Sequence, residues 1–401
     1  MTKTKNNSEK TTTTTTITNK TTTDTNTNTN ININKNNNSK VVEKTKTKLT
    51  QTTLIPIKKV IQEKLKPIKK LNRKQMELDV KYNELSLNCN EPKSDWPEWR
   101  QHLYDHGWAI VPKVVAKERC KEYLSRFWDW LEGFGSGLKR DRPSTWTSDN
   151  WPGNIHGIFQ NYALGHQQFV WDIRQETDIM KIFEMIYQTP ELLVSFDGGN
   201  LSRPTNTEPK SWAHFDQGSS KFGFRCIQGF LNLDVCQEND GGLIVYQDSH
   251  LQHDKYFAES AEQSQGDWYK FEKDPHSLKW FKDCKKIKVC CEPGDVVLWD
   301  SRTIHYACPP VKNSGNGNCR AVVYVSYQPA SLASEKVLAQ KQQAFHSKRM
   351  TSHWAAENIK LFPRTPRTYG NEERVEKFRF DETTLPILNE FGRKLAGLDS
   401  Y

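Results

Sequence analysis

Two histidines and one aspartate have the residue types and spacing of a metal site. His214 and Asp216 stand two residues apart, so in an extended segment both side chains project to the same face. His305 follows a tight turn at Pro293-Gly294 and a wholly apolar strand. Two imidazoles and one carboxylate on a β-scaffold form the facial triad that suits Fe(II), with three coordination positions left open. Alone, His-x-Asp is weak, because a hydrogen-bonded histidine beside a surface aspartate gives the same pattern.

An arginine lies fifteen residues beyond the second histidine. Arg320 opens the apolar strand Ala321–Val325, and its planar guanidinium could bind the distal carboxylate of a co-substrate. We expect Val296–Asp300 to pair with Ala321–Tyr327 in an antiparallel hairpin. That pairing would bring Arg320 alongside the distal metal ligand.

The order of these motifs resembles the phytanoyl-CoA dioxygenase family of Fe(II)- and 2-oxoglutarate-dependent oxygenases. The segments that carry the resemblance are Gly107–Pro112, His214-x-Asp216, Asn239-Asp240-Gly241-Gly242, Pro293-Gly294-Asp295, His305 and Arg320. The resemblance covers about residues 97–350. It implies a mainly β fold with flanking helices around a double-stranded β-helix, the jelly-roll or cupin-like core. It also implies hydroxylation of a C–H bond in a small-molecule or acyl substrate, with release of succinate and CO2 and with ascorbate as a candidate reductant.

The resemblance also assigns roles to residues. It makes His214, Asp216 and His305 the iron ligands, Arg320 the partner of the C5 carboxylate of 2-oxoglutarate, and Gln228 part of the co-substrate pocket. Two features depart from the family: Ala307 stands where a hydroxyl residue is often found, and Asn313–Asn318 lengthens the connection to Arg320. Asp216 argues against the related halogenases, which have a small residue at that position.

Two other functions remain open at this point. The first is a jelly-roll metal-binding protein without 2-oxoglutarate turnover, acting as a binding or regulatory module. The second is a cupin-like enzyme that uses iron or manganese without 2-oxoglutarate. In the second case Arg320 would have no assigned role.

Several other residues are candidates for the site. His250 is expected to be a structural hydrogen-bonding group rather than a fourth ligand, and Trp299 a core residue. Arg203 and Arg225 could meet an anionic substrate, although surface arginines are commoner. The adjacent Cys290-Cys291 pair lacks the spacing of a zinc site.

The elements that must position these residues can be inferred from periodicity. Helical spacing from Cys120 to Leu131 and again near residues 172–188 predicts two helices, and Pro190 ends the second. The predicted strands are Cys226–Val235, Gly242–Gln247, Ile287–Cys291, Val296–Asp300 and Ala321–Tyr327. Short strands at this spacing indicate a sandwich, barrel or jelly roll. A helical tail is expected after Pro329.

The N-terminal part has a different composition. Of residues 1–50, 18 are Thr and 11 are Asn, so we expect a disordered tail that contributes nothing to folding. Residues 51–95 are expected to be a basic linker with some helical spacing, and residues 96–401 the oxygenase domain. Residues 58–74 could be a nuclear-targeting segment, but a solvated linker is the commoner meaning of such basic runs.

Charge and hydropathy exclude several classes of protein. Residues 1–90 hold 18 of the 57 Lys and Arg residues but 7 of the 48 Asp and Glu residues. The rest of the chain is therefore slightly acidic, and no nucleic-acid partner is expected for it. No stretch approaches 18 apolar residues and no signal peptide is evident, so we expect no membrane span. Nine cysteines without a CxxC pair favour reduced thiols in an intracellular, cytoplasmic or nuclear, protein.

Overall fold

The structure of the chain is a computed structural model. It describes residues 73–205, 211–260, 264, 266–270, 272, 275–311, 319–367, 370, 372–378 and 384–401. The expectations for the Thr/Asn-rich tail, for most of the basic linker and for the insertion Asn313–Asn318 fall outside these residues. Residues Leu71–Tyr401 form one compact unit.

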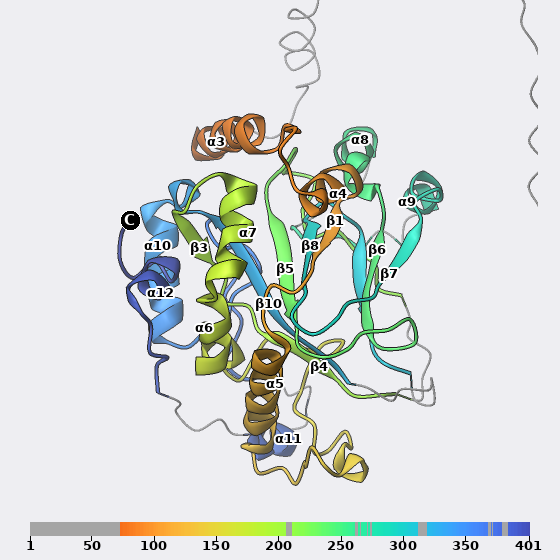
Figure 1. The fold of residues 1–401 in the computed structure, drawn as a ribbon, viewed down its shortest axis with the longest axis vertical. Coiled ribbons are helices and arrows are strands. Elements are labelled where there is room, and N and C mark those ends of the chain that lie inside the picture. Colours follow the sequence, from red (N-terminus) through yellow and green to blue (C-terminus); the bar gives the residue numbers. More distant parts are fainter. Residues whose placement is uncertain are drawn as a thin grey trace, which may run out of the picture. The chain divides into compact units, whose positions relative to one another are not determined.

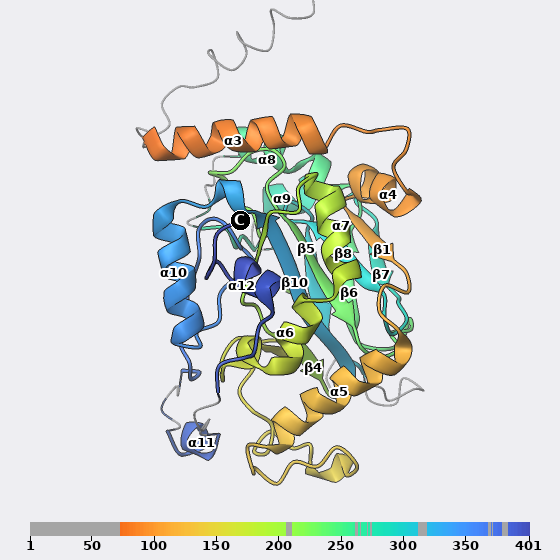
Figure 2. The ribbon, with the colours of Figure 1, turned by 60° about the vertical axis from the view of Figure 1, so that its left-hand side comes forward.

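Two antiparallel sheets face each other in this unit (Figures 1 and 2). The larger sheet has the order β1 (Trp108–Val111), β8 (Val296–Asp300), β5 (Ile227–Asn232), β10 (Arg320–Pro329), β4 (Gly199–Ser202) and β2 (Ile158–Phe159), with β3 (Leu192–Val194) also on β10. The smaller sheet has the order β7 (Lys286–Val289), β6 (Gly242–Tyr246) and β9 (His305–Cys308). This is the jelly-roll core expected from the sequence.

Helices cover the outer face of the larger sheet. They are α5 (Lys117–Glu132), α6 (Gln168–Arg174), α7 (Thr177–Tyr187), α10 (Glu335–His346) and α12 (Glu390–Leu395), and all contribute to one apolar cluster with that sheet. Figure 2 shows α6, α7, α10 and α12 on the same side of β10. The remaining helices are α3 (Arg73–Cys89), α4 (Glu98–His106), α8 (His253–Glu259), α9 (Pro275–Trp280) and α11 (Glu372–Lys377).

The side chains that alternate along β8 show that the larger sheet is buried on both faces. Val296 and Leu298 pack into the cluster on the helix side, whereas Val297 and Trp299 pack into the cluster between the sheets. Successive side chains of a strand point to opposite faces, so a wholly apolar strand serves two cores at once. Each buried side chain of this size contributes about 1.5–3 kcal/mol.

The structure confirms the predicted strands and divides one predicted helix. The helix from Cys120 to Leu131 is α5. The segment 172–188 contains the end of α6 and the whole of α7. Gln188 then adopts a left-handed backbone conformation with φ 53° just before Pro190, which ends α7.

The predicted hairpin between Val296–Asp300 and Ala321–Tyr327 is wrong. Strand β5 lies between β8 and β10 and pairs with both of them. The chain passes from β8 to β9 in the smaller sheet before it returns to the larger sheet as β10. Strands β8, β9 and β10 therefore alternate between the two sheets, and Arg320 reaches the interior by that crossing rather than by a hairpin.

Helix α3 is held against the domain by a buried arginine. Arg225 is 3 % exposed, its Nη2 lies 2.6 Å from Asp79 Oδ1, and its guanidinium lies 4.3 Å from the ring centre of Tyr82. Tyr82 itself is buried. The domain therefore includes residues from α3 onward, which extends the boundary expected at residue 96. Arg225 is therefore a buried arginine rather than a surface arginine, and it is not among the residues that line the cavity described below.

We predict that Asp79→Ala lowers the free energy of unfolding by about 2 kcal/mol, because it leaves the buried Arg225 charge without its carboxylate. Denaturant titration of the full chain measures this change. The exposed Asp95→Ala is the control, with an expected change within about 0.5 kcal/mol. Equal stabilities for the two variants would show that α3 is not anchored by this pair.

Among the described segments, every helix is too short or too polar to cross a lipid bilayer.

Candidate metal and co-substrate site

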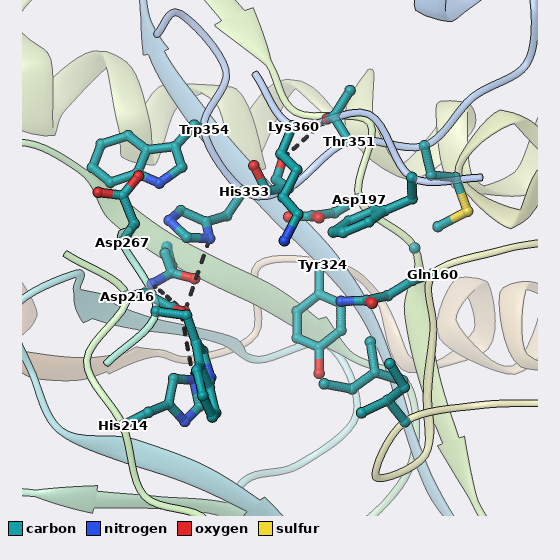
Figure 3. Close-up of a pocket in the computed structure, with 18 of the residues that line it drawn as sticks. Gln160, Asp197, His214, Asp216, Asp267, Tyr324, Thr351, His353, Trp354 and Lys360 are labelled. Carbon is teal, nitrogen blue, oxygen red and sulfur yellow. Dashed lines mark hydrogen bonds and ion pairs between the residues drawn. The ribbon is translucent and has the colours of Figure 1, made fainter. Parts of the chain in front are cut away.

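Three side chains that could bind a metal lie together at one edge of the smaller sheet, where a loop pairs with β9. His305 is the first residue of β9, and His214 lies opposite it in an isolated antiparallel bridge with two backbone hydrogen bonds of 3.1 Å. The carboxylate of Asp216 lies 3.5 Å from His214 Nε2 and 3.4 Å from His305 Nε2. The ligand atoms of the three residues all lie within 4.8 Å of one another. The expected convergence is therefore found, and Figure 3 shows His214 and Asp216 turned toward each other.

The protonation states of these groups suit a metal. His214 Nδ1 lies 3.1 Å from the carbonyl oxygen of Trp212, and His305 Nδ1 lies 2.9 Å from that of Thr303. A proton on each Nδ1 leaves Nε2 free as the ligand atom. Burial lowers the pKa of His214. Burial alone would raise the pKa of Asp216, but the neighbouring His214 and His353 hold that pKa well below its usual range. A neutral imidazole and an ionised carboxylate are the forms that bind Fe(II).

Gln228 contacts the aspartate of this group. It lies on β5 beside Trp299 of β8, and its Nε2 donates a 3.1 Å hydrogen bond to Asp216 Oδ2. The bond holds the carboxylate in one orientation, which is how residues behind a ligand tune metal affinity. Gln228 also lines the cavity described below, so its expected place near a co-substrate remains a prediction.

We predict that Gln228→Leu weakens Fe(II) binding by about 10-fold, because the carboxylate of Asp216 loses the donor that orients it. Anaerobic Fe(II) titration of the full chain measures the affinity. Gln160→Leu is the matched control, since Gln160 lines the same cavity and makes no hydrogen bond to Asp216 among the described residues. If both variants change the affinity equally, the bond from Gln228 does not orient the ligand.

A cavity of about 920 Å³ opens beside these three residues. Arg320, the first residue of β10, also lines it. Residues 320, 322 and 324 share one face of β10, and Val322 of this set packs between the two sheets. Arg320 therefore points inward: it is 4 % exposed, with its guanidinium 5.3 Å from the ring centre of Phe230. Its Nη1 is buried without a hydrogen-bond partner among the described residues. A buried cation with an unused donor is costly, so the site is shaped for an anion.

Sequence reasoning missed one wall of the cavity. Residues 350–354, 358–360 and 362 line it. His353 Nδ1 lies 3.8 Å from Asp216 Oδ2 (Figure 3). The segment is brought there by tertiary contacts, including the bridge between Thr351 and Leu361 and the bond from the Phe196 amide to Thr351 Oγ1. No periodicity signals such contacts. Asp197, which precedes β4, was missed for the same reason.

The other candidates have structural roles. His250 Nε2 lies 2.9 Å from the carbonyl oxygen of Tyr104, away from the cavity lining, as expected for a structural histidine. Arg203 Nη1 donates to the carbonyl oxygen of Thr147 at 2.9 Å. Trp299 is 3 % exposed in the inter-sheet cluster, and it also lines the cavity. The cluster of His214, Asp216 and His305 is the one candidate metal-binding group found among the described residues, so Cys290 and Cys291 form none there.

The chain is similar in sequence and in structure to known proteins. A sequence model of the phytanoyl-CoA dioxygenase (PhyH) family matches residues 103–311. Ava biosynthesis cluster protein O of Aspergillus versicolor is 32 % identical over 266 residues, which cover 63 % of this chain and 84 % of that protein. A putative phytanoyl-CoA dioxygenase of Dictyostelium discoideum is 22 % identical over 241 residues, covering 50 % of this chain and 67 % of the relative. The crystal structure of SnoK, a non-haem α-ketoglutarate-dependent carbocyclase from nogalamycin biosynthesis, is similar with a TM-score of 0.42 and 16 % identity, covering 60 % of this chain and 86 % of SnoK.

The fold and the site define a non-haem iron- and 2-oxoglutarate-dependent oxygenase. The chain belongs to the phytanoyl-CoA dioxygenase family. Its residues fit the two groups that the family uses. A cluster of two imidazoles and one carboxylate is a donor set for Fe(II), and the unpaired Nη1 of Arg320 is a donor for a carboxylate of 2-oxoglutarate.

Proposed function

We propose that this protein hydroxylates a C–H bond of a small molecule and converts 2-oxoglutarate to succinate and CO2 in the same reaction. His214, Asp216 and His305 hold the iron, and Arg320 binds the C5 carboxylate of 2-oxoglutarate. The observation that carries the proposal is that one cavity contains a possible metal-binding triad and the buried guanidinium of Arg320, whose Nη1 has no hydrogen-bond partner in the described part of the chain. The slightly acidic sequence after residue 90 supports a small-molecule substrate rather than a nucleic acid.

The protein contributes position and exclusion of water. Bound iron supplies the activation of dioxygen, coupled to oxidation of 2-oxoglutarate. His214, Asp216 and His305 would hold iron beside the cavity. The guanidinium of Arg320 would bind the C5 carboxylate of 2-oxoglutarate and fix that end of the co-substrate. The apolar walls, which include Trp212, Trp299 and Trp354, keep bulk water from the reacting groups.

The test is turnover of 2-oxoglutarate by the full chain. Protein loaded with Fe(II) and 2-oxoglutarate under anaerobic conditions is exposed to oxygen, with and without ascorbate, and succinate is quantified. We expect succinate in excess of the iron present. A metabolite mixture should raise the rate when it contains the substrate, because substrate binding couples decarboxylation to hydroxylation.

The competing function is a metal-binding protein without turnover. The feature that favours it is Ala307, which lines the cavity where the family often has a hydroxyl group. In that case iron binds but no succinate forms at any concentration of 2-oxoglutarate. The same experiment therefore separates the two functions.

A further inference from the structure

Two charged side chains in the cavity have no use in the proposed iron and 2-oxoglutarate sites. Asp216 belongs to the metal cluster and Arg320 to the co-substrate. Asp267 pairs with Lys221, whose Nζ lies 2.5 Å from Asp267 Oδ1. The remaining charged lining residues among the described part of the chain are Asp197 and Lys360. Figure 3 shows both on the wall formed with Thr351 and His353.

Asp197 is fixed in place although its carboxylate is not paired. Its backbone carbonyl accepts a hydrogen bond from Arg174 Nη2, and the preceding amide of Phe196 donates to Thr351 Oγ1 at 2.9 Å. The carboxylate accepts one hydrogen bond, from Ser195 Oγ at 3.3 Å. Among the described residues, no basic side chain forms an ion pair with it, because Arg174 donates to carbonyl oxygens instead. The carboxylate is therefore a preorganised acceptor that faces the cavity.

The charges of the described cavity residues show that the carboxylate of Asp197 lacks a cationic partner there. The two positive charges of Fe(II) and that of Arg320 are balanced by Asp216 and by the two carboxylates of 2-oxoglutarate. Burial raises the pKa of Asp197 to about 7, because the buried guanidinium of Arg174, which donates to its backbone carbonyl, offsets the effect of burial only in part. A carboxylate in this position is costly unless a donor or cation joins it. Asp197 and Asp216 line the same cavity, so a group bound at Asp197 would share that cavity with the metal site.

We propose that Asp197 anchors a positively charged nitrogen of the substrate, such as an amine or a guanidinium. The substrate class is then an organic cation with an apolar body. This inference rests on the proposed function and names the substrate class of the same site. The body would pack against the apolar wall, which consists of Ile155, Ile158, Trp212, Trp268, Trp354 and Ile359. Tryptophan faces also attract cations, by about 0.5–2 kcal/mol.

Lys360 is the alternative partner for Asp197. It is exposed, and its Nζ lies 5.8 Å from the ring centre of Phe362. A flexible, solvated lysine loses side-chain entropy when it is fixed in a pair, so we expect it to leave Asp197 open. Removal of Lys360 separates this alternative from the proposal.

The experiment compares three probes of one shape and different charge: 4-phenylbutylamine, 4-phenylbutan-1-ol and 4-phenylbutyrate. Binding to the full chain is followed by tryptophan fluorescence, both in the metal-free protein and with Fe(II) and 2-oxoglutarate without oxygen. The amine should bind at least about 10-fold more tightly than the alcohol, as a charge-assisted hydrogen bond predicts. Asp197→Asn should remove this preference, and Lys360→Met should keep or increase it. Thermal unfolding and Fe(II) affinity verify that Asp197→Asn is folded.

Three outcomes would overturn the proposal. The alcohol could bind as tightly as the amine, or the carboxylate could do so while 2-oxoglutarate occupies Arg320, or Asp197→Asn could retain the preference. A preference seen only in Lys360→Met would show that Lys360 is the native partner of Asp197. The binding measurement in the metal-free protein does not require turnover. Failure of the cation site is therefore distinguishable from failure of the oxygenase function, in which case no succinate would form.

Discussion

Replacing His305 with alanine is expected to weaken Fe(II) binding by more than roughly 100-fold, which exceeds the effect of losing a residue that only orients a ligand. His305 supplies one of three ligand atoms within 4.8 Å, and its Nδ1 is already committed to the carbonyl oxygen of Thr303. Two remaining ligands cannot hold Fe(II) against water and buffer. Succinate formation should fall to the level of a reaction without protein. Anaerobic Fe(II) titration and succinate analysis measure the two effects.

His250→Ala is the matched control. His250 is also a buried histidine with a ring nitrogen near a backbone carbonyl, that of Tyr104 at 2.9 Å, but it does not line the cavity. The variant should lose stability and keep its iron affinity. If His305→Ala binds Fe(II) within about threefold of the unchanged protein, the metal lies elsewhere and the triad is not the site.

The fold could be anticipated where one local pattern decides it. The apolar run Val296–Asp300 predicted a strand, and the structure shows that this strand, β8, packs into two cores. The pairing could not be anticipated from such patterns. Hairpin reasoning assumes that neighbours in sequence pair, whereas here β9 enters the other sheet between β8 and β10. A crossing between two sheets does not change the alternation of side chains along each strand, so the local pattern does not reveal it.

The site residues also divide into those with a local sequence pattern and those without one. His214 and Asp216 were found because residues two apart on extended chain share a face. Asp197 and His353 were not found, because they reach the cavity through contacts such as the bond from the Phe196 amide to Thr351. Arg225 shows the reverse case: its partner Asp79 lies 146 residues away on a helix that the sequence assigned to a linker. Long-range pairs of this kind leave no local signal.

Arg320→Lys is expected to weaken 2-oxoglutarate binding by about 10- to 100-fold and to leave Fe(II) affinity unchanged. The guanidinium of Arg320 is buried, and its Nη1 has no partner among the described residues. Lysine keeps the charge but replaces a planar fork with a single ammonium group on a differently shaped side chain, so the paired hydrogen bonds to a carboxylate are lost. Anaerobic titration of the iron-loaded protein with 2-oxoglutarate measures the change.

Arg302→Lys controls for the loss of a buried guanidinium in general. Arg302 makes a bidentate pair with Asp300, with distances of 2.9 Å from Nε and 2.8 Å from Nη2, and it does not line the cavity. This variant should be less stable and should bind 2-oxoglutarate normally. If Arg320→Lys instead binds 2-oxoglutarate as well as the unchanged protein, the co-substrate carboxylate is held elsewhere. Lys360 is the other basic side chain among the described cavity residues, so Lys360→Met would then be the variant that loses 2-oxoglutarate affinity.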